Sequence, residues 1–215
     1  MKQNHLKRIA GYTLDQMILI VAIIAILVTI IILSIGWSII SRSSGAKLAS
    51  QFRQVEDANG QFYAANRVWP QDSVTASNSS TNILALTGGA TYRAGLISTE
   101  NIKNYVPGFR ISGSDVLHNF GGAGGIITMA TRNAPFGLTG TYLVVQFTGV
   151  PFSEVVEAEK AIDGGTTVNA DYTTGRVTAF TTTAGNCFTG TPNATAASVS
   201  PGTPVAACYV ANLIQ

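Results

Sequence analysis

The stretch that decides the fold is residues 12–33, which read YTLDQMILIVAIIAILVTIIIL. This stretch lies in a longer run, between Asp15 and Arg42, that contains no charged residue. As an α-helix, that run would reach ~39 Å, and the ~30 Å core of a bilayer needs about twenty apolar residues. The sequence therefore predicts an apolar helix over 12–41 that crosses a membrane once.

The first eleven residues carry positive charge only. Lys2, Lys7 and Arg8 lie within 1–11, which has no acidic residue. Basic residues beside a membrane span tend to remain in the cytoplasm, so we expect a cytoplasmic N-terminus and an external remainder. No Ala-x-Ala pattern closes the apolar run as it would in an ordinary secretory signal. The small residue placed for a cleavage site is Gly11, before the apolar run.

The helix is expected to continue as an amphipathic segment over 42–67. Four apolar residues recur there at helical spacing and predict one buried stripe: Leu48, Phe52, Val55 and Phe62. Pro70 ends the helix because proline cannot donate an interior hydrogen bond. This half of the helix is expected to pack on a sheet.

Short segments rich in β-branched residues predict that sheet. The expected strands are 125–131, 141–148, 166–172 and 176–182, with a hairpin joining the last two and a helix between 151 and 164. The predicted fold class is α+β, with a long N-terminal helix packed by its C-terminal half on an antiparallel sheet. Residues 42–215 are expected to form one external globular head.

Charge and motifs exclude several functions. Charged residues make up 11% of the chain, and the formal charge is +2. Without the three basic residues of 1–11, ten basic residues stand against eleven acidic ones, so no nucleic-acid partner is predicted.

Ser114, Asp115 and His118 lie close together, but a loop histidine is a better interpretation than a triad. Glu154, Glu157 and Glu159 suit the solvated face of a helix. We predict no enzyme, no cofactor and no metal site.

The order of basic leader, Gly11, Tyr12, Thr13, Leu14 and a long aliphatic helix resembles the N-terminus of the type IV pilin family, and a glycine-rich segment at 119–125 resembles its IVb branch. The resemblance implies a type IV pilin-like fold, cleavage after Gly11 and N-methylation of Tyr12. It also implies that the apolar helix assembles into a filament. The family usually has glutamate at the fifth mature position, which here is Gln16. Asp15 is the nearest carboxylate, and it either pairs with the Tyr12 amine or caps the helix.

Cys187 and Cys208 are the two cysteines of the chain. In an external head they are expected to form a disulfide, closing the loop 187–208 with a stabilisation of roughly 3 kcal/mol. In the pilin family, such a C-terminal disulfide region commonly forms exposed surface that varies in recognition.

The resemblance predicts a structural subunit that polymerises with copies of itself into a surface pilus or fimbrium. Its implied partners are a prepilin peptidase and a pilus assembly platform, with the precursor held in the bacterial inner membrane. One alternative is a minor pilin or a type II secretion pseudopilin. Another is a single-span envelope protein with a binding head. A role in cell adhesion is one of several that the filament could serve.

Overall fold

The computed structural model describes residues 14–120, 125–164, 172–195 and 197–214, with the backbone alone for 14–15 and 32–44. Two compact units, Met1–Ile40 and Ser41–Gln215, are described separately below.

Helix α1 covers Leu14–Asn66 and has 53 residues. Its end follows from the local sequence. Arg67 adopts a left-handed backbone conformation with φ 59° while its N–H still donates to the Tyr63 carbonyl at 2.7 Å. Pro70 then opens a separate short helix. The helix therefore ends one residue before the predicted boundary at 67.

The membrane-spanning interpretation of 12–41 has to be corrected. No helix in the described part of the chain is both long and apolar enough to cross a membrane. A single-pass precursor in the inner membrane therefore lacks support from the described residues.

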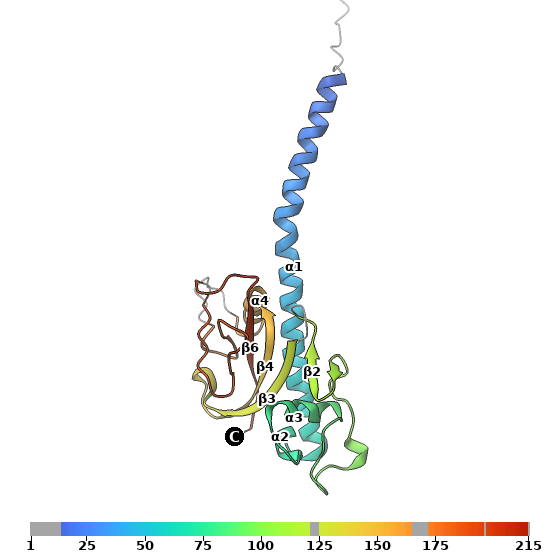
Figure 1. Cartoon of the computed structure of the whole chain (residues 1–215), viewed down its shortest axis with the longest axis vertical. Coiled ribbons are helices and arrows are strands. Elements are labelled where there is room, and N and C mark those ends of the chain that lie inside the picture. Colours follow the sequence, from blue (N-terminus) through green and yellow to red (C-terminus); the bar gives the residue numbers. More distant parts are fainter. Residues whose placement is uncertain (1–13, 121–124, 165–171, 196, 215) are drawn as a thin grey trace, which may run out of the picture. The chain divides into compact units, whose positions relative to one another are not determined.

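The second unit contains a six-stranded sheet in the order β1-β2-β3-β4-β6-β5, and all neighbouring strands are antiparallel (Figure 1). The strands are β1 (Arg110–Ser112), β2 (Asp115–His118), β3 (Gly125–Asn133), β4 (Thr141–Pro151), β5 (Val177–Ala179) and β6 (Pro204–Leu213). The chain reaches β6 last but inserts it between β4 and β5.

Short helices complete this unit. They are α2 (Pro70–Ser73), α3 (Ser79–Leu84), α4 (Phe152–Ile162) and the 3-10 helices η1 (Ala85–Thr87), η2 (Thr99–Asn101) and η3 (Pro135–Gly137). Asn78 caps α3, because its side-chain oxygen accepts from the backbone N–H groups of Ser80 and Thr81. Helix α4 lies against α1 at Gly45, where an added Cβ would overlap the Cβ of Glu157.

The main core lies between the C-terminal half of α1 and one face of the sheet (Figure 1). The four residues of the predicted stripe are all fully buried there: Leu48, Phe52, Val55 and Phe62. The Phe52 ring stacks on Tyr209 of β6 at 4.8 Å and meets Phe147 of β4 edge-on at 5.0 Å. A smaller core on the other face contains the two cysteines and Phe180.

Several predicted elements are confirmed, and one strand was missed. Strands β3 and β4 and helix α4 lie where the sequence predicts them. Val177–Ala179, within the predicted strand 176–182, pairs with β6. The hairpin between 166–172 and 176–182 stays a prediction. Of the first segment, 166–171 lies outside the described residues. The sequence reading also missed β6, whose side chains are buried on both faces and therefore do not alternate with polar residues.

Candidate functional site

The most unusual surface is the apolar stretch of α1 between 17 and 31. Its large side chains are 41–63% exposed: Met17, Ile18, Leu19, Ile20, Val21, Ile23, Ile24, Ile26, Leu27, Val28, Ile30 and Ile31. Four consecutive residues, 18 to 21, already cover a full turn of the helix, so the apolar surface surrounds it. A helix that is apolar on every side is normally buried. We call these residues the apolar stretch.

The one hydroxyl within the apolar stretch does not interrupt this character. The Thr29 hydroxyl donates to the carbonyl of Ala25 at 2.8 Å, within the same helix. A threonine bonded in this way turns its polar atom toward the helix backbone and leaves its methyl group outward. The surface offered to a neighbour is therefore apolar throughout the stretch.

Of the predicted processing and assembly residues, only Asp15 and Gln16 belong to α1. Gly11 and Tyr12 lie outside the described residues, so their predicted cleavage and methylation stay predictions. Asp15 belongs to the helical backbone of α1, and Gln16 is exposed in the same turn. The proposed pairing of Asp15 with the Tyr12 amine also stays a prediction.

The predicted disulfide is confirmed. Cys187 and Cys208 are joined, with their Cα atoms 5.6 Å apart, and both are fully buried. Cys208 lies in β6, whereas Cys187 lies in the long segment between β5 and β6. The bond therefore fastens that segment to the outer face of the sheet, and the loop 187–208 includes part of β6 as well as irregular chain.

Two polar side chains from the sheet hold the same segment. Arg132 of β3 donates from Nη1 to the carbonyls of Cys187 at 2.8 Å and Gly190 at 2.7 Å. Gln146 of β4 donates to the Gly185 carbonyl at 3.0 Å and accepts from the Cys187 N–H at 2.9 Å. Sequence analysis missed both residues. The only local signal is Gln146, a polar side chain directly after the apolar run of β4.

A polar cluster joins α1 to the strands of the second unit. Arg176 donates from Nη2 to Glu56 at 2.7 Å and to the Ala211 carbonyl at 3.1 Å. The Tyr209 hydroxyl donates to the other carboxylate oxygen of Glu56. Burial, together with the anionic Glu56, raises the pKa of Tyr209. The cluster fixes α1 against β6 and contains no activated nucleophile.

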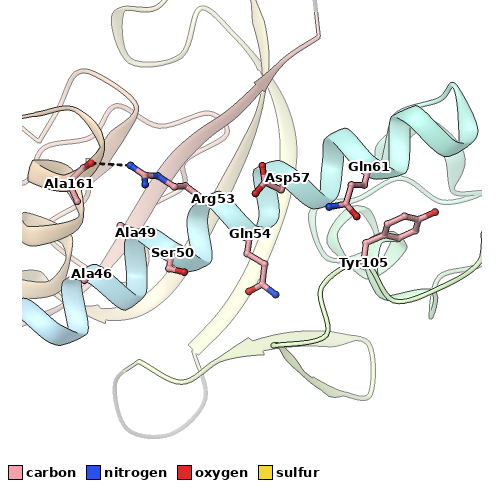
Figure 2. A pocket seen from close by; sticks show the side chains of 9 residues that line it. All are labelled: Ala46, Ala49, Ser50, Arg53, Gln54, Asp57, Gln61, Tyr105 and Ala161. Carbon is pink, nitrogen blue, oxygen red and sulfur yellow. Dashed lines mark hydrogen bonds between the residues drawn. The ribbon is translucent and has the colours of Figure 1, made fainter.

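A groove of about 550 Å³ runs along α1 in the same unit. Figure 2 shows the side chains that line it. Its lining consists of Ala46, Ala49, Ser50, Arg53, Gln54, Asp57, Gln61, Tyr105 and Ala161. Arg53 donates across one end to the Ala161 carbonyl at 3.1 Å. The wall combines small, amide and oppositely charged side chains.

The side chains that were weighed as catalytic candidates in the sequence make structural contacts instead. Both ring nitrogens of His118 bond to backbone groups, so neither is available to activate Ser114. Glu157 forms an exposed ion pair with Lys160 at 2.9 Å. Within the described ranges, no three side chains of the metal-binding types gather into a site.

No protein-family model, no curated protein and no solved structure matches this chain.

Proposed function

We propose that this chain is a filament-forming subunit of the type IV pilin kind, which assembles with copies of itself through the apolar stretch of α1. The observation that carries the proposal is the exposure of that stretch on all sides of the helix. Burying one large aliphatic side chain contributes about 1.5–3 kcal/mol. Several such burials offset the about 4–15 kcal/mol that association costs in lost freedom.

The distribution of these side chains favours a polymer over a closed dimer. A two-fold partner covers one side of a helix, whereas this stretch is apolar over the full turn from Ile18 to Val21. Complete burial requires several neighbours around each helix. Contacts of this kind between different surfaces of identical subunits generate open helical filaments when the rotation does not close. The bundle of apolar helices would form the core of such a filament.

The leader motif supports the same proposal. A glycine without a side chain, Gly11, separates the basic residues of 1–11 from the apolar run. In the proposal, a prepilin peptidase cleaves after Gly11, Tyr12 becomes the methylated N-terminus, and an assembly platform adds the subunit to a filament at the cell surface. Gln16, in place of the usual glutamate, favours a minor subunit as the alternative. The abundance of this chain in sheared filaments would distinguish major from minor.

The first test places a charge in the apolar stretch. We expect Ile24→Asp to abolish incorporation into filaments, because the carboxylate would have to be buried among apolar helices without a partner. Filaments sheared from cells that contain their own assembly system would be analysed by mass spectrometry. The wild-type subunit should start at Tyr12 and carry an N-methyl group.

The matched control is Ala64→Asp, which adds the same charge at an exposed position of the same helix. This variant should assemble as the wild type does. Normal filament yield from Ile24→Asp would contradict assembly through the apolar stretch. Assembled wild-type subunits that still begin at Met1 would contradict the proposed cleavage.

A second test concerns Asp15. Cleavage after Gly11 would leave a positive amine at Tyr12 inside an apolar core, where an unpaired charge costs several kcal/mol. Asp15 is the acidic residue nearest to it in sequence, and Gln16 cannot neutralise the charge. We expect Asp15→Asn to lower filament yield more than Gln16→Ala does, with both variants cleaved. Equal yields from wild type and Asp15→Asn would favour a simple helix cap.

A further inference from the structure

His118 lies in an enclosed site at the end of β2. The residue is 4% exposed, and its ring stacks on Phe147 of β4 with the centroids 5.0 Å apart and an angle of 11°. On the neighbouring strand its register partner is Gly125. A Cβ at Gly125 would overlap the His118 ring and the Thr148 carbonyl. The ring therefore occupies the space that a side chain on β3 would otherwise fill.

Two backbone groups determine which ring nitrogen carries the proton. His118 Nε2 lies 2.8 Å from the carbonyl oxygen of Thr148, which can only accept. Nδ1 accepts from the N–H of Phe120 at 3.1 Å, and an N–H can only donate. Nε2 must therefore be protonated, and Nδ1 must be bare. The site as built accommodates the neutral ring alone.

A second proton would break one of these contacts. Protonated Nδ1 cannot accept from Phe120, so two N–H groups would face each other and the Phe120 N–H would lose its partner. Phe120 is itself buried, and its ring lies beneath the Lys47 ammonium of α1, with 5.7 Å from Nζ to the ring centroid. Protonation would therefore also weaken the contact between Phe120 and α1.

No described anion would compensate for a positive ring. Asp115, on β2, lies on the opposite face of the strand from His118, and β4 contains no charged residue. Arg110 of β1 is one strand further out and exposed, while Arg132 of β3 binds the carbonyls near Cys187. From α1, the nearby charge is the like-charged Lys47. The sequence around the site adds none, since 105–109 and 119–125 contain no ionisable acid or base except Tyr105.

The direction of the pH effect follows from these surroundings. Burial lowers the pKa of His118, and the hydrogen bond to the Thr148 carbonyl offsets part of this shift. A histidine in the unfolded chain has a pKa of about 6.5. Between that value and the lower folded value, the unfolded or opened chain binds more protons than the native state. Stability is therefore complete above about pH 6.5 and falls as the pH decreases through this window.

We propose that His118 is an acid-operated latch: the neutral ring holds the end of β2 and Phe120 in place, and a proton on Nδ1 releases them. The inference rests on the packing of the second unit and is independent of the proposed filament. Acidification would then loosen the contact of Phe120 with α1 while the central strands stay paired. The latch gives this surface a state that depends on pH.

The test is an NMR titration of the full chain in detergent between pH 7.5 and pH 4. We expect the ring nitrogen signals of His118 to report the Nε2-protonated neutral form near neutral pH. The exchange protection factor of the Phe120 amide should then fall by up to about tenfold for each pH unit below about 6.5. Protection of Val145, in the centre of β4, should change less over the same range.

Two variants assign the effect. His5→Gln, which removes the other histidine of the chain, should keep the acid-dependent loss at Phe120, and His118→Gln should eliminate it. An unchanged acid-dependent loss in His118→Gln would overturn the latch. If His118→Gln does not fold, the wild-type titration decides by itself. Protonation of Nδ1 without loss of Phe120 protection would contradict the proposal, and their coincidence would support it.

Discussion

Replacing Phe52 by alanine is expected to lower the free energy of unfolding by about 3–5 kcal/mol. Phe52 is fully buried and contacts two strands at once, through its stack on Tyr209 and its edge-to-face contact with Phe147. The substitution would remove the ring and leave a cavity between α1 and the middle of the sheet. Denaturant unfolding, monitored by a signal from the second unit, would measure the change.

A control on the same helix separates loss of packing from a general effect on α1. Gln61 is exposed, and alanine is a better helix former than glutamine, so Gln61→Ala should change stability by less than about 0.5 kcal/mol. A loss of under 1 kcal/mol for Phe52→Ala would mean that this core can collapse around the missing ring. Such a result would also show that Phe52 contributes little to holding α1 against the sheet.

Removal of the disulfide is expected to have an effect of similar size. Cys187→Ser should lower the free energy of unfolding by about 2–5 kcal/mol, because the unfolded chain regains the freedom that the bridge between Cys187 and Cys208 restricts. Urea unfolding of the wild type and the variant, each extrapolated to water with its own slope, would measure the difference. Peptide mapping without reductant should recover the two cysteine peptides linked.

Reductant provides the control for this prediction. It should destabilise the wild type toward the stability of Cys187→Ser and leave the variant unchanged. Arg132 and Gln146 would still hold the backbone near Gly185 and Gly190, so the segment should keep part of its order. Two alkylatable thiols in the native protein, or equal stability of the two forms, would contradict the prediction.

Local periodicity was sufficient to predict the packed half of α1. The stripe from Leu48 to Phe62 repeats at helical spacing, and its four apolar members are fully buried. Proline and the left-handed Arg67 then fix where the helix ends. The apolar stretch was also visible in sequence, although its assignment as a membrane span is corrected by the described residues.

Contacts between distant segments could not be predicted in the same way. Glu56 and Arg176 lie 120 positions apart, so no local pattern indicates that they pair. Strand β6 was missed for a related reason: both of its faces are covered, one by α1 and the other by the segment that Cys187 anchors. In an apolar run without alternation, periodicity cannot distinguish a buried strand from a buried helix. The register of such a strand depends on its partners.

The position of β6 also determines the order in which the second unit can be completed. Strands β1 to β4 are synthesised first, yet one edge of β4 remains open until residues 204–213 arrive to pair with it. An open edge with apolar side chains is a template for pairing with other chains. Strand β5 also waits, since its ladder partner is β6. A nascent chain that has not yet delivered β6 would therefore be the form most exposed to aggregation and most dependent on chaperones.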